Sequence, residues 1–70
     1  MHRTANELSF AFFVLLNAPL GRVEAATRFE RLWDETNEAA SASLGTESAT
    51  TYIELLKDMD ARWRRLSALN

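Results

Sequence analysis

The stretch from Leu8 to Leu16, Leu-Ser-Phe-Ala-Phe-Phe-Val-Leu-Leu, constrains the fold more than any other part of the 70-residue chain. It holds three of the four Phe residues, and Ser9 is its only polar side chain. On a helix that turns by about 100° per residue, its apolar side chains point in every direction and leave no polar face. A helix that is apolar all round must be buried all round. We therefore expect the other segments to be arranged around this one.

The chain is long enough for one domain, over residues 1–70, and too short to be very stable alone. A domain of this size buries only roughly 60% of its unfolded surface. Disulfides, a metal or oligomerisation are the usual remedies. The sequence has no Cys and a single His, His2, so disulfides and metal sites rich in Cys or His are excluded. Oligomerisation or docking onto a partner is the remedy that remains.

Helix breakers divide the chain into three segments, because Pro19 and Gly21 mark one junction and Gly45 marks the other. The sequence predicts an all-α, three-helix unit with helices at about 5–16, 22–44 and 48–69. A very apolar N-terminal helix would pack on an antiparallel hairpin of two amphipathic helices. The hairpin covers only part of the first helix. We therefore expect a helical-bundle homodimer, with a tetramer as the alternative.

The first segment carries a helix start signal and a helix stop signal. Thr4 and Glu7 have the spacing of a capping box, in which each side chain bonds the backbone of the other. At the other end, Asn17 tolerates the left-handed conformation that ends helices. Pro19 pushes the residue before it out of the α region. A strand over residues 10–14 is the rival interpretation, but no second strand candidate exists to pair with it.

The second and third segments each show apolar residues at the alternating spacing of three and four that packed helices use. In the second segment these are Ala26, Phe29, Trp33, Thr36 and Ala40. In the third they are Tyr52, Leu56, Met59, Trp63 and Leu66. The second helix could end at Asn37 or continue to Leu44, and a Gly45 cap favours the longer version. Opposite faces carry acid-first i,i+4 pairs: Glu24 with Arg28, Asp58 with Arg62 and Asp60 with Arg64.

Catalytic chemistry has little support in the sequence, so we expect no enzyme, no cofactor and no metal. A nucleophilic Ser needs a base, and the only His lies at the far terminus from the Ser- and Thr-rich turn around Gly45. The carboxylates lie on solvated faces beside Arg or Lys. Trp33 and Trp63 could line a ligand pocket, but their positions in the apolar stripes favour plain core.

The sequence best fits a small non-enzymatic protein that acts through self-association and protein–protein contact. The first helix would supply the interface. The residues expected there are Leu8, Phe10, Phe12, Phe13, Val14 and Leu16. The expected partner is a second copy of the chain or another protein. The absence of Cys is typical of a reducing cytoplasm.

Two other functions compete with this hypothesis. Arg62, Arg64 and Arg65 form a small basic cluster that dimerisation would double, as in a nucleic-acid-associated regulator. The formal net charge of -2 weighs against a generally basic surface. Interfacial membrane association through the apolar helix is the second alternative, although that helix lacks a cationic polar face. A signal peptide is disfavoured because Glu7 precedes the apolar run, where positive charge is usual.

Overall fold

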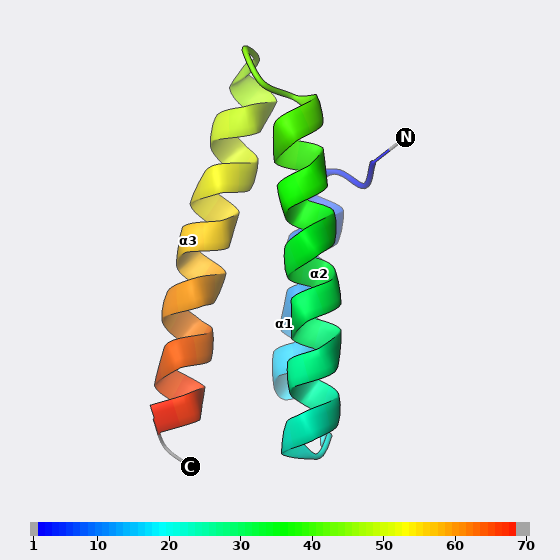
Figure 1. Cartoon of the computed structure of the whole chain (residues 1–70), viewed down its shortest axis with the longest axis vertical. Helices are drawn as coiled ribbons and strands as arrows, with labels where there is room; N and C mark the ends of the chain where they lie inside the picture. Colours follow the sequence, from blue (N-terminus) through cyan, green and yellow to red (C-terminus); the bar gives the residue numbers. More distant parts are fainter. Residues whose placement is uncertain (1, 69–70) are drawn as a thin grey trace.

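The structure, a computed structural model, describes residues 2–68 as three helices with no strand among them. Helix α1 spans Ala5–Asn17, α2 spans Arg22–Ala42 and α3 spans Glu47–Ala68. Figure 1 shows α2 and α3 side by side in opposite directions, with α1 behind them. The all-α class and the antiparallel hairpin are confirmed, and the rival strand over residues 10–14 is wrong.

Helix α1 begins with the predicted capping box. Thr4 Oγ1 accepts from the backbone N–H of Glu7 (3.1 Å), and Glu7 Oε1 accepts from the backbone N–H of Thr4 (2.8 Å). Ala18, the residue before the proline, is extended, with φ −75° and ψ 144°. The left-handed stop expected at Asn17 is wrong, because only a glycine has positive φ in residues 2–68. Asn17 instead donates from Nδ2 to the carbonyl oxygen of Phe13 (2.8 Å).

The turn between α2 and α3 depends on a glycine. Helix α2 ends at Ala42, between the two ends that the sequence left open. Gly45 has φ 87°, a left-handed conformation that L side chains rarely adopt. The hydroxyl of Thr46 donates to the carbonyl oxygen of Ser43 (2.6 Å), which closes the turn before α3 begins. The expected end of the third helix at residue 69 lies outside the described residues.

The core lies where α1 rests against the groove of the hairpin. One cluster contains Leu8, Ala39, Ala40 and Tyr52, and the other contains Phe12, Leu15, Phe29 and Met59. The rings of Phe12 and Phe29 have centroids 5.4 Å apart and planes inclined at 59°, a favourable tilted contact. Burying a side chain of this size stabilises the fold by roughly 1.5–3 kcal/mol. The apolar run of α1 thus holds the three helices together.

The apolar stripes of α2 and α3 are buried over most of their length, with exceptions near the end farthest from the Gly45 turn. Ala26 and Leu66 are exposed, so the stripes are shorter than the spacing predicted. Thr36 has no exposed surface, and its hydroxyl donates to the carbonyl oxygen of Leu32 (2.7 Å). This internal hydrogen bond removes the cost of an unpaired buried hydroxyl.

Helix α1 is not buried all round within one chain, in agreement with the expectation that the hairpin covers only part of it. Leu8, Phe12 and Leu15 face the hairpin and are buried. Phe10 and Phe13 on the same helix stay exposed. Two helices can cover only one side of a third, so the opposite side has no neighbour within the chain.

Candidate protein-binding face on helix α1

Three apolar side chains form the outer face of α1, the surface that we define by Phe10, Phe13 and Val14. Their exposed fractions are 68%, 61% and 50%. Residues three and four apart are neighbours on a helix. Phe13 and Val14 follow Phe10 by three and four residues, so the three side chains form one continuous patch. Single exposed apolar residues are ordinary on protein surfaces, but a contiguous aromatic patch marks an interaction site.

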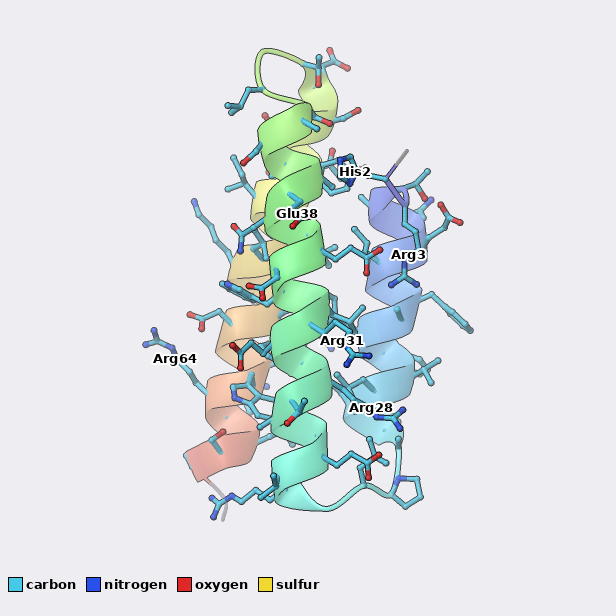
Figure 2. All side chains as sticks on the ribbon, turned by 45° about the vertical axis from the view of Figure 1, so that its right-hand side comes forward. His2, Arg3, Arg28, Arg31, Glu38 and Arg64 are labelled. Carbon is cyan, nitrogen blue, oxygen red and sulfur yellow. The ribbon has the colours of Figure 1, made fainter. Side chains whose placement is uncertain are left out.

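A groove between α1 and α2 extends this face toward the arginines of α2. Its volume is about 250 Å³, and its walls are mostly apolar. The lining residues are Ala11, Val14, Leu15, Ala18, Leu20, Arg28, Arg31 and Leu32. Because Val14 belongs to both the groove and the outer face of α1, the two surfaces are continuous. Figure 2 shows Arg28 and Arg31 extending from α2 toward α1.

The arginines on this side of the molecule differ in how they are paired. Arg28 binds Glu24 at 2.8 Å within α2, and both side chains are more than half exposed. Arg31 has no ion pair or hydrogen bond from its side chain within residues 2–68. Its guanidinium is therefore available to a carboxylate of another molecule.

Arg3 joins the N-terminal residues to α2 through a two-point ion pair. Its Nε and Nη2 atoms each donate to a carboxylate oxygen of Glu35 at 2.7 Å. This hydrogen bonding lowers the pKa of the Glu35 carboxyl and raises the pKa of Arg3. The carbonyl oxygen of Arg3 also accepts from the Tyr52 hydroxyl (2.8 Å), which ties the start of α1 to α3. Sequence reasoning missed these contacts because they join residues 32 and 49 positions apart.

Glu7 is the carboxylate nearest the outer face of α1 in sequence. The hydrogen bond from the backbone N–H of Thr4 lowers the pKa of the Glu7 carboxyl. The hydrogen bond with the Thr4 side chain lowers this pKa further. One carboxylate oxygen is engaged in this cap. The other has no hydrogen-bond partner within residues 2–68. Glu7 thus keeps its negative charge and one free oxygen at neutral pH.

The predicted interface residues do not all lie on the surface. Leu8 and Phe12 have no exposed area, so they are corrected from interface residues to core residues. Leu16 is half-buried and packs against the core cluster of Phe12. Phe10, Phe13 and Val14 lie on the outer face of α1. An apolar run with no polar face gave no signal that could separate these two groups.

The basic cluster on α3 is mostly paired within its own helix. Arg62 binds Asp58 at 3.2 Å and Arg64 binds Asp60 at 3.1 Å. These two pairs, and that of Glu24 with Arg28, confirm the predicted i,i+4 contacts. Arg65 lies in the last turn of α3, where the helix dipole stabilises a cation. In Figure 2, Arg64 points away from α1, so the cluster and the outer face of α1 are separate surfaces.

Phe29 stacks on both Trp33 and Trp63 in an aromatic cluster. The Phe29 ring lies 4.5 Å from Trp63 and 5.9 Å from Trp33, in both cases nearly parallel. Both indoles are partly buried and pack against the core. They line a shallow groove of about 330 Å³ together with Ala26, Phe29, Glu30 and Asp60. The larger groove, about 640 Å³, lies at the end of the molecule beside Leu20 and Leu66.

Residues 2–68 contain no group of His, Cys, Asp or Glu side chains arranged to hold a metal ion. Within the same range, no helix is long and apolar enough to cross a membrane. Comparison with known proteins gives no assignment, since no family model, no curated protein and no solved structure matches the chain. The fold and the surface define the class only as a small three-helix protein with an aromatic patch on one helix.

Proposed function

We propose that this chain is a non-enzymatic protein-binding module that self-associates through the outer face of α1. The observation that carries the proposal is the exposure of Phe10 and Phe13 at 68% and 61%. Covering one such side chain stabilises a complex by roughly 1.5–3 kcal/mol at full burial. A second copy of the chain is the specific partner proposed, since two-fold dimers are the commonest closed assemblies.

The mixed charge around this patch favours a protein surface over a lipid surface. An interfacial membrane helix combines an apolar face with a cationic face. Here Arg3 and Arg28 are each paired with a glutamate on α2, so their charges are offset locally. Interfacial membrane association remains a weaker proposal for the same residues.

Nucleic-acid association through α3 is also a weaker proposal. Two of its three arginines, Arg62 and Arg64, bind aspartates of the same helix. Phosphate contacts would have to compete with these ion pairs. Absence of binding at about 50 mM salt, where phosphate contacts are strong, would end this alternative.

Native mass by light scattering tests the leading proposal. At a concentration where the wild-type chain is associated, Phe13→Asp should elute with the monomer mass of 7.9 kDa, because the carboxylate would be buried unpaired. Leu44→Asp is the matched control. Leu44 is 73% exposed but lies in the turn between α2 and α3, so the control should keep the wild-type mass. If Phe13→Asp also keeps the wild-type mass, the proposal is wrong.

A further inference from the structure

We propose that two copies of this chain pack α1 against α1 in opposite directions, around a two-fold axis near Phe10, and that Glu7 of each subunit binds Arg31 of the other. This inference rests on the proposed self-association and adds the orientation of the partner and the residues that select it. Figure 2 shows Arg31, the cation of this pair, extending from α2 toward α1.

The two opposite charges lie at different positions along the outer face of α1. Glu7 and Val14 are seven residues apart, so they lie on the same stripe of α1, about 10 Å apart along its axis. Arg31 lines the groove that Val14 enters, on the side of α1 that faces α2. The face therefore carries an acid toward one end of α1 and a base about two turns away, on the same side.

A two-fold axis fixes which residues of the two subunits meet. In a two-fold interface, residue i of one subunit contacts residue j of the other, and j contacts i in return. When two helices pack in opposite directions, the N-terminal half of one faces the C-terminal half of the other on the same side. Glu7 then meets Val14 and Arg31 of the partner subunit, and the reciprocal contact forms at the other end. Both ion pairs come from one arrangement.

Parallel packing would give a different result. A parallel two-fold axis runs along the helices, so residues at the same height lie on opposite sides of the contact, and Glu7 would not face Glu7 of the partner subunit. Each Glu7 would then lie on the side of the contact away from Arg31 of the partner subunit, and no ion pair would form between them. Arg31 has no ion pair within residues 2–68, and Glu7 has no direct ion pair there, although the charge of Arg3 acts on it, so only antiparallel packing brings Glu7 and Arg31 together.

The apolar side chains fit the same arrangement. Phe10 lies close to the midpoint between the levels of Glu7 and Val14, so the two-fold axis brings the two Phe10 rings together. Phe13 covers the other side of the contact. The 13 residues of α1 extend over about 20 Å, so the contact falls at the small end of specific interfaces, below about 1,200 Å². A concentration-dependent dimer is expected from an interface of this size.

Disulfide trapping tests the orientation, because the sequence has no Cys and an introduced thiol is the only one present. Glu7→Cys and Val14→Cys are oxidised separately and as an equimolar mixture. A disulfide needs Cα atoms about 4.4–6.8 Å apart. Antiparallel packing brings the Cα atom of residue 7 in one subunit within this distance of the Cα atom of residue 14 in the other. The Cα atoms of residue 14 in the two subunits are instead about 12 Å apart. The mixture should therefore give the hetero-disulfide, and each variant alone should stay largely unlinked.

Three outcomes separate this inference from the proposed function. A wild-type chain that is monomeric at every concentration overturns both. A wild-type dimer in which Val14→Cys links mainly to itself, or in which no preparation links, overturns the antiparallel arrangement alone. A hetero-disulfide in the mixture supports both.

Charge reversal gives an independent readout of the ion pair. Arg31→Glu should weaken the dimer about fivefold to tenfold, because two pairs per dimer are lost and replaced by repulsion. Adding Glu7→Lys to that variant should restore most of the affinity. Arg65→Glu reverses a charge on α3 and should leave the dissociation constant unchanged. A double variant that binds no better than Arg31→Glu overturns the pairing of Glu7 with Arg31.

Discussion

The two faces of α1 have similar side chains and opposite surroundings. The inner face carries Leu8 and Phe12 with no exposed area, and the outer face carries Phe10 and Phe13 with most of their surface exposed. Both faces come from one continuous apolar run. The comparison shows that hydrophobicity identifies the side chains that are stabilised by burial. The arrangement of the neighbouring helices decides which of them are buried within one chain.

Truncation of one Phe on each face gives the largest expected difference. Phe12→Ala should lower the free energy of unfolding by about 3–5 kcal/mol, because it leaves a cavity beside Phe29. Phe13→Ala should change the stability of the isolated chain by less than about 0.5 kcal/mol. Urea unfolding of the dilute protein measures both. Equal losses for the two variants would show that the faces do not differ as described.

The hydroxyl of Tyr52 offers a smaller test, because it fastens the residues before α1 against the hairpin. Tyr52→Phe keeps the buried ring and removes the hydrogen bond to the carbonyl oxygen of Arg3. We expect a loss of about 1 kcal/mol in the free energy of unfolding. Faster amide exchange at the start of α1 should accompany it. An unchanged stability would mean that this contact does not hold the inner face in place.

The ion pair between Arg3 and Glu35 gives the smallest effect, and pH reveals it. The pKa values of Glu35 and Glu7 are held below the ordinary Glu value of 4.5 in the folded chain. The unfolded chain therefore takes up protons first as the pH falls. Stability contributed by these carboxylates is complete well above pH 4.5 and is lost as the pH drops through the folded pKa values.

Glu35→Gln should weaken this acid dependence. We expect its melting temperature to fall less than that of the wild-type chain between about pH 6 and pH 3. Glu54→Gln removes a carboxylate that accepts no hydrogen bond within residues 2–68, so it should follow the wild-type curve. Identical acid dependence in all three chains would remove Glu35 from this account.

The number of helices and most of their boundaries could be predicted from the sequence because these depend on local signals. The capping box of Thr4 and Glu7 set the start of α1, and the breakers at Pro19 and Gly45 set the junctions. The i,i+4 ion pairs followed from spacing alone.

The covered face of α1 could not be predicted in the same way. An apolar stripe opposite a polar stripe identifies the buried face of a helix, but the apolar run of α1 has no polar stripe. Leu8 and Phe12 therefore could not be separated from Phe10 and Phe13. The contacts of Arg3 with Glu35 and Tyr52 depend on how three helices pack, and no local pattern in the sequence encodes them.

Native molecular mass of the wild-type chain by light scattering, across a dilution series, tests most directly whether the outer face of α1 meets a second copy. We expect a mass near twice 7.9 kDa at high concentration that falls toward 7.9 kDa on dilution. A mass of 7.9 kDa at every concentration would contradict self-association, because Phe10 and Phe13 would then stay exposed in the free protein.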